Sequence, residues 1–238
     1  MKINRVILWI TIFSIAMGFM EAAVVIYLRA LYYPEGFSFP LMIIDYNIAI
    51  TEFIREIATI IMLAGAGILA GKKNIERFAF FIFSFAVWDI FYYIFLKFIL
   101  NWPDSFFTWD ILFMVPVTWV GPVLAPVINS LTMVFLAGSI LFILKKNEKV
   151  KIGVATWALL ILGSGVIIFS YTKEYISYML GRFSFSEMLG VSGNKDILKY
   201  ACSFIPQHFN WYIFGIGFLM HIAAIFGILF KNKFNSKN

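Results

Sequence analysis

Residues 49–71 read AITEFIREIATIIMLAGAGILAG, and this stretch decides the fold class. About 20 consecutive apolar residues are enough for an α-helix to cross the hydrocarbon layer of a membrane. The stretch is long enough, yet it carries Glu52, Arg55 and Glu56 near its start. It therefore predicts a membrane-spanning helix with a charged site inside it.

The rest of the chain has the same character. Of its 238 residues, 62% are hydrophobic and 13% are charged, and the mean hydropathy is +0.89. One water-soluble globule could not bury so much apolar surface, so a lipid bilayer is the expected partner. We predict an all-α polytopic transmembrane helix bundle that forms one domain over 1–238. Its spans are expected near 6–28, 49–71, 78–100, 119–144, 152–171 and 209–230.

The basic residues predict the orientation of these six spans. Twelve of the 19 lysines and arginines lie in the two tails and in the connections after the second and fourth spans. Because loops rich in Lys and Arg stay in the cytoplasm, both termini are predicted to be cytoplasmic. The net charge of +6 then reflects topology and attraction to lipid headgroups, and nucleic acid is not an expected partner.

Three longer connections, 29–48, 101–118 and 172–208, face the opposite side. The first two are rich in Trp, Tyr and Phe, which settle at the headgroup level of a membrane. We expect them to form ordered caps on the outer surface. The sequence leaves open whether 101–118 and 199–208 re-enter the membrane.

Three prolines disturb the fourth predicted span. Pro116, Pro122 and Pro126 each remove a backbone donor within about three helical turns. We therefore predict a proline-broken fourth span. It would consist of a short helix or re-entrant piece near 108–117, a break at 120–122, and then the span itself.

Charged side chains lie inside the predicted spans, where each costs roughly 2.5–3.5 kcal/mol on insertion scales. Glu21 lies about 22 Å from the cytoplasmic end of the first span, and Asp89 lies near the middle of the third. On the second span, Glu52, Arg55 and Glu56 project from one side at i,i+3 and i,i+4 spacing. Such a group at one depth calls for an explanation.

Further polar residues share faces with this group. Tyr92 and Tyr93 lie on the face of Asp89, and Asn210 and His221 line up on the sixth span. With these faces inward, the bundle would enclose a carboxylate-rich pocket open to the outer side. The predicted substrate- or ion-binding residues are Glu21, Glu52, Arg55, Glu56, Asp89, Tyr92, Tyr93 and His221, and the predicted rim residues are Arg29, Asp110, His208 and Asn210. The alternative is a purely structural role, in which these contacts only hold the helices in register.

The chemistry of this pocket stays open. Carboxylates with an imidazole suit a hard or borderline metal, and the possible ligands are Glu21, Glu56, Asp89 and His221. The Glu-x-x-His spacing of di-iron bundles is absent, however. The sequence also lacks HExxH, GxSxG, P-loop and CxxC motifs, which argues against zincin, serine hydrolase, P-loop and thiol oxidoreductase activities in their usual forms. The cofactor and the catalytic residues are therefore left unassigned.

Three functions fit this inventory. Binding or transport of a small polar or cationic solute would use the buried carboxylates, and so small a bundle would transport only as a homodimer. A membrane-embedded enzyme acting on a lipid or isoprenoid substrate, with or without a metal, would use them as acid or base. An accessory subunit of a membrane complex would need them only for assembly. The first function is slightly favoured.

Four stretches carry a resemblance to known sequences. They are EAAVVIYLRALYYPEGF from Glu21, WDIFYY from Trp88, WPDS from Trp102, and TWDILF from Thr108 followed by GPVLAP from Gly121. These stretches, in roughly the N-terminal half, resemble an uncharacterised family of bacterial multi-pass membrane proteins. The resemblance implies no activity, but it implies a bacterial inner membrane, which makes the outer side periplasmic.

Overall fold

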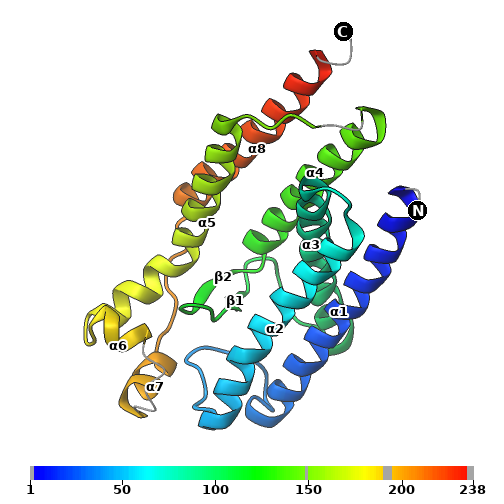
Figure 1. The fold of residues 1–238 in the computed structure, drawn as a ribbon. Helices are drawn as coiled ribbons and strands as arrows, with labels where there is room; N and C mark the ends of the chain where they lie inside the picture. Colours follow the sequence, from blue (N-terminus) through cyan, green and yellow to red (C-terminus); the bar gives the residue numbers. More distant parts are fainter. Residues whose placement is uncertain (1–2, 148–149, 190–194, 235–238) are drawn as a thin grey trace.

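The computed structural model describes residues 3–147, 150–189 and 195–234. Within these ranges, six helices are long and apolar enough to cross a membrane, which confirms the predicted multi-pass helical bundle. They are α1 (Ile3–Tyr32), α2 (Tyr46–Ala70), α3 (Asn74–Leu100), α4 (Leu124–Asn147), α5 (Val154–Leu180) and α8 (Trp211–Phe234) (Figure 1). Two short helices, α6 (Phe185–Leu189) and α7 (Lys195–Cys202), follow α5. Parts of both predicted tails and of the connection 172–208 lie outside the described residues.

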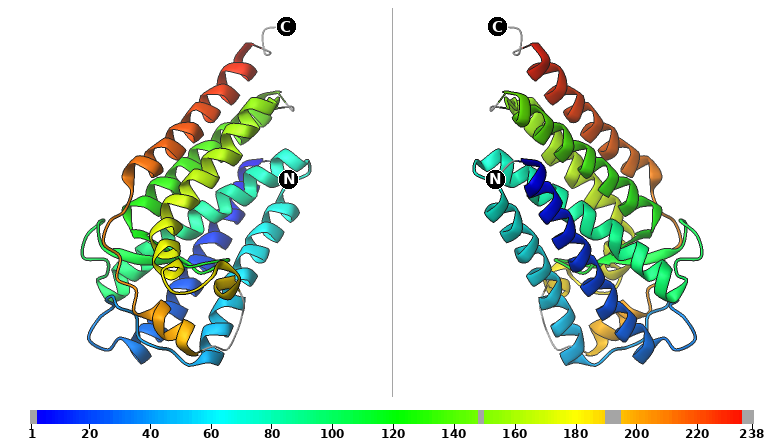
Figure 2. Two further views of the ribbon diagram at one scale, coloured as in Figure 1. Left: turned by 90° about the vertical axis from the view of Figure 1, so that its left-hand side faces the viewer. Right: turned by 90° about the vertical axis from the view of Figure 1, so that its right-hand side faces the viewer.

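Helices α3 and α4 stand at the centre of the bundle. Both α1 and α2 pack on α3, α3 packs on α4, and α4 packs on α8, which runs beside α5 (Figure 2). Helix α1 begins and α8 ends toward the same end of the bundle, whereas α6 and α7 lie toward the opposite end (Figure 1). The two ends therefore differ, and only the second carries extended connections.

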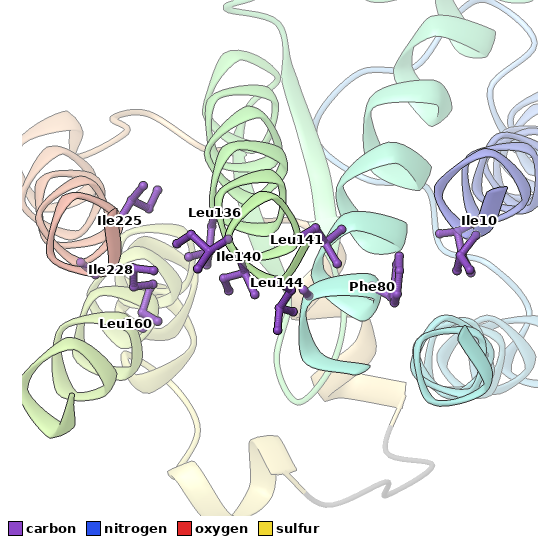
Figure 3. Packing of buried hydrophobic residues seen from close by; sticks show 13 residues of the cluster. Ile10, Phe80, Leu136, Ile140, Leu141, Leu144, Leu160, Ile225 and Ile228 are labelled. Atoms are coloured by element: carbon purple, nitrogen blue, oxygen red, sulfur yellow. The ribbon is translucent and has the colours of Figure 1, made fainter. Parts of the chain in front are cut away.

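Apolar side chains fill the half of the bundle in which α1 begins. In Figure 3, Ile140 of α4 lies between Phe80 of α3 and Ile228 of α8, and side chains of α1 and α5 extend the same layer. These three side chains are almost completely buried. Between membrane helices, such close van der Waals packing is a main source of association. This half of the bundle is consequently a closed apolar core, and a polar site has to lie in the other half.

The connection between α3 and α4 differs from the prediction. Residues Trp109–Phe113 (β1) and Trp119–Pro122 (β2) form an antiparallel hairpin instead of a short helix, with Asp110 opposite Gly121. Aromatic and branched residues favour extended backbone, and a proline at a strand end removes no ladder hydrogen bond that the hairpin needs. The all-α prediction therefore needs one amendment, a two-stranded hairpin.

The fourth membrane helix is likewise not the broken span that was predicted. Helix α4 begins only at Leu124, after Pro122, and continues to Asn147. Pro126 lies in its first turn, where backbone N–H groups have no intrahelical partner and a proline removes nothing. The prolines thus mark the hairpin and the start of the helix rather than a break at membrane depth.

Helix α5 is longer than its predicted span, which ended at residue 171. It continues through the polar residues Thr172, Lys173 and Glu174 to Leu180. These residues lower the hydropathy of the sequence, but nothing in them stops a helix. The extension projects toward α7 and brings Tyr175 to the site described next.

Candidate functional site

A cavity of about 290 Å³ lies in the half of the bundle opposite the apolar core. Its walls come from α1, α2, α3, the β1 strand, α5, α7, the connection between α1 and α2, and the connection between β1 and β2. The charged side chains that line it are Glu21, Arg29, Glu52, Arg55, Glu56, Asp89 and Asp110. Tyr92 and Tyr93 line it as well, so every predicted binding residue except His221 lies at this one cavity.

Arg55 joins α2 to α1 through two carboxylates. Its Nε donates to Glu52 Oε2 at 2.9 Å, its Nη2 donates to Glu52 Oε1, and its Nη1 donates to Glu21 Oε1. Thr59 donates to the other oxygen of Glu21 at 3.4 Å. The i,i+3 spacing in the sequence explains the pair of Arg55 with Glu52. The depth of Glu21 along α1 explains its pair with Arg55. This trio carries one net negative charge, so its own charge disfavours the binding of an anion.

Arg29 and Asp110 form a second ion pair, with 3.4 Å between Nη2 and Oδ1. The guanidinium carbon lies 3.7 Å from the ring centre of Trp102, a cation–π contact. Tyr93 donates to the other oxygen of Asp110 at 3.1 Å. We expected both charged residues at the rim, but they are buried in the wall, because the hairpin carries Asp110 inward and Trp102 covers Arg29.

The environment of Asp110 also affects its protonation. Burial raises the pKa of this carboxyl to about 6, although the Arg29 guanidinium and the Tyr93 hydroxyl lower it. The folded state therefore binds the proton more tightly than an exposed aspartate does. The contribution of this group to stability is greatest in acid and is lost as the pH rises through about 6.

Two carboxylates in the cavity have no cationic partner. Glu56, only 7% exposed, accepts the Met114 backbone N–H at 2.8 Å through Oε2, and Asp89 accepts the Ser130 hydroxyl at 2.7 Å through Oδ2. In the part of the chain that the structure describes, neither makes an ion pair, and the second oxygen of each has no hydrogen-bond partner. Each side chain is thus held by one oxygen and offers the other to the cavity.

The two histidines and Asn210 lie away from this cavity. His221 lies between α8 and α5, with Nε2 at 3.2 Å from both Ser164 Oγ and the Leu160 carbonyl oxygen. His208 is exposed, and Asn210 accepts the Ile213 backbone N–H at the start of α8. Their helix faces α5 because Gly217 allows the two backbones to approach closely. The sequence predicted one face of α8 but could not show which neighbour it meets.

No metal centre emerges from the described residues. Within the ranges 3–147, 150–189 and 195–234, no three His, Cys, Asp or Glu side chains lie close enough together to hold a metal ion. Glu21, Glu56 and Asp89 share the cavity, but His221 lies elsewhere. The set of possible metal ligands taken from the sequence is therefore not brought together.

The outer wall of the cavity was missed by sequence reasoning. Leu41, Met42 and Ile44 from the first outer connection line it, together with Leu198 and Ala201 of α7. Leu41 donates its backbone N–H to the Cys202 carbonyl at 2.8 Å, which fastens the two segments together. In the sequence, only the apolar and aromatic composition of the first outer connection indicated such a role. Its contact with α7 joins two segments far apart in the chain, and neither segment carries a sequence pattern that predicts it.

The charged lining of this partly open cavity is predominantly acidic. Five carboxyl groups face two guanidinium groups in its lining, and both guanidinium groups are already paired. Such a site attracts cations and disfavours anions, because burial in a medium of low polarity strengthens both effects. Comparisons of the chain with known protein families, with curated proteins and with solved structures found no match, so its function has to be inferred from this cavity.

Proposed function

We propose that this protein binds a small cationic solute in the cavity, from the outer side of a bacterial inner membrane, as the first step of its transport. The observation that carries the proposal is that Glu56 and Asp89 line the cavity without forming an ion pair among the described residues, and that each leaves one carboxylate oxygen without a hydrogen-bond partner. A buried charge without a partner is costly. A cationic ligand would remove that cost, which gives the site its affinity.

A purely structural role, in which the charges only hold helices together, explains part of this arrangement. It accounts for the Arg55 trio and for the Arg29–Asp110 pair, since each joins separate elements. Glu56 also has a structural contact with the hairpin. A neutral amide would make that contact equally well, however, so hairpin anchoring does not explain why a carboxylate is present.

Binding of methylammonium and tetramethylammonium tests the proposal. We expect both salts to raise the melting temperature of the purified protein saturably, relative to sodium chloride at equal ionic strength. In Glu56→Gln and Asp89→Asn, binding of both should weaken about tenfold or more, because the attraction between the carboxylate and the cation is lost, and for methylammonium a charged hydrogen bond is lost as well. Each amide keeps the oxygen that accepts from Met114 or Ser130, so the fold should survive. Isothermal calorimetry measures the affinities.

The matched control is Glu35→Gln, which removes an exposed acid from the same side of the protein and does not line the cavity. Its affinity should equal that of the unchanged protein. Absence of saturable binding, or equal affinities in all variants, would refute cation binding. Stabilisation by neutral lipids that survives both amide substitutions would instead favour the membrane-embedded enzyme.

The orientation is part of the same proposal. The described parts of the basic tails and connections, at the start of α1, between α2 and α3, at the end of α4 and at the end of α8, lie toward the end of the bundle opposite α6 and α7, and basic loops stay in the cytoplasm. In a Cys202→Ala background, an impermeant maleimide should label Glu35→Cys in intact cells. Lys72→Cys, which lies in the connection between α2 and α3, should be labelled only after the membrane is opened. The reverse pattern would place the cavity on the cytoplasmic side.

Transport requires a conformational change that binding alone does not. The packed core around Phe80, Ile140 and Ile228 closes the inner half of the bundle, so the solute has no exit on that side. The core would have to open while the carboxylates become shielded from outside. A six-helix bundle is small for such a change, and we retain a homodimer as part of the transport hypothesis.

A further inference from the structure

The cavity is long, and its two ends differ. Along α1 it is lined from Glu21 to Tyr32, which at 1.5 Å per residue is about 17 Å. The unpaired carboxylates of Glu56 and Asp89 belong to its deeper part, ten or more residues from the outer ends of their helices. An inorganic ion would use only this deeper part, so the remaining length needs a different explanation.

The outer part of the cavity is apolar and firmly built. Leu41, Met42 and Ile44 line it from one segment, and Leu198 and Ala201 line it from α7. The backbone bond between Leu41 and Cys202 joins the two segments, and Tyr33 Oη accepts the Met42 N–H at 2.9 Å. A fixed apolar wall beside an acidic pocket suits a ligand with an apolar body, because burial of such a body is favourable.

The deeper part favours an organic cation over a metal ion. Hard cations such as Ca²⁺ need six to eight oxygen ligands, and no group of three ligating side chains is found in the described residues. Trp88, Tyr92 and Tyr93 line the cavity beside the carboxylates. Aromatic rings next to carboxylates are a favourable setting for an alkylammonium group.

We propose that the ligand is an amphiphilic organic cation, a primary or substituted ammonium with an unbranched apolar body, bound with its charge at Glu56 and Asp89 and its body against the Leu41 and α7 wall. This inference rests on the proposed function and names its ligand class. The volume of about 290 Å³ is at the small end of known ligand pockets, which limits the body to a short chain.

A homologous series of n-alkylammonium chlorides, from butyl to octyl, tests this in lipid nanodiscs. Each methylene buried against the wall should tighten binding by up to about fourfold, so octylammonium should bind roughly 50- to 250-fold more tightly than butylammonium. Glu56→Gln and Asp89→Asn should weaken all members by a similar factor and leave the dependence on chain length unchanged. The n-alkanols of the same lengths are the control for partitioning into lipid.

The wall is tested separately by Ala201→Phe, which fills the outer part without touching the carboxylates. Binding of octylammonium should fall at least tenfold, and binding of butylammonium should change little. The matched control is Ser203→Phe on the exposed side of the same segment. Equal loss for both amines, or no loss for either, would contradict the assignment of the apolar body to this wall.

The outcomes separate this inference from the proposed function. If butylammonium binds but chain length has no effect, cation binding stands and the amphiphilic ligand is wrong. If no amine binds, both are wrong, and if alkanols bind with the same dependence on length, the wall binds apolar molecules without using the carboxylates. Phosphatidylethanolamine in the nanodisc should not compete, because it carries two long acyl chains and a phosphate. Competition by this lipid would contradict a short, unbranched cation.

Discussion

Replacing Arg55 by methionine should lower the free energy of unfolding by about 3–5 kcal/mol, because it leaves the Glu21 and Glu52 carboxylates inside the bundle without a cation. The guanidinium makes both bonds to Glu52 and the bond to Glu21, so no other described residue replaces it. A large fall in melting temperature in mild detergent, with loss of monodisperse protein, is the expected measurement.

The control removes the charges together. The triple variant Glu21→Gln, Glu52→Gln and Arg55→Met leaves no charge of this cluster unpaired, and replacing a complete buried ion cluster by neutral groups is often tolerated. It should recover most of the lost stability. A single Arg55→Met variant as stable as the unchanged protein would contradict the ion cluster. Failure of the triple variant to recover would show that the geometry of Arg55, rather than charge balance, holds α1 to α2.

The same comparison divides the charged residues by role. The trio around Arg55 and the Arg29–Asp110 pair are electrically paired within the protein. Glu56 and Asp89 are not. The triple variant should therefore weaken alkylammonium binding less than Glu56→Gln or Asp89→Asn does, because it removes one net negative charge from the lining but leaves in place both carboxylates that meet the ammonium group. The affinities of these variants would then distinguish carboxylates with a structural role from carboxylates that bind the ligand.

The helices and the charged group could be predicted because their signals are local. Hydropathy over about 20 residues identifies a span, and the spacing of Glu52 and Arg55 places them on one side of a helix. The depth of Glu21 in the membrane follows from counting residues along its helix. This depth matches that of Arg55, so the contact between the two could be anticipated. Each of these features depends on one segment and on the thickness of a membrane.

The remaining features depend on contacts between distant segments. The direction of His221 is set by Gly217 and Gly163, where α8 meets α5, and a face on one helix does not identify its neighbour. The hairpin at Trp109 is short, and its prolines predict a disturbed helix equally well. The wall formed by Leu41 and α7 requires pairing across more than 150 residues. None of these has a periodic pattern in the sequence.

Within α2, Gly67 allows the close approach to α3, and Gly67→Leu should be the most disruptive apolar substitution in this helix. A Cβ at this position would lie 2.7 Å from the Phe81 backbone nitrogen and 2.9 Å from the Arg77 carbonyl oxygen. Backbone atoms cannot rotate away as a side chain can, so the helices must separate. We expect a loss of roughly 3 kcal/mol or more, measured as melting temperature.

Gly65→Leu is the matched control, because it makes the same change two residues away on the same helix. A Cβ there would meet nothing within 4 Å, and replacing a helical glycine removes a conformational cost of up to about 1 kcal/mol. Its stability should be unchanged or slightly higher. Since α2 also carries Glu56, Gly67→Leu should lose alkylammonium binding while Gly65→Leu keeps it. Equal behaviour of the two variants would mean that the α2–α3 contact does not position the cavity.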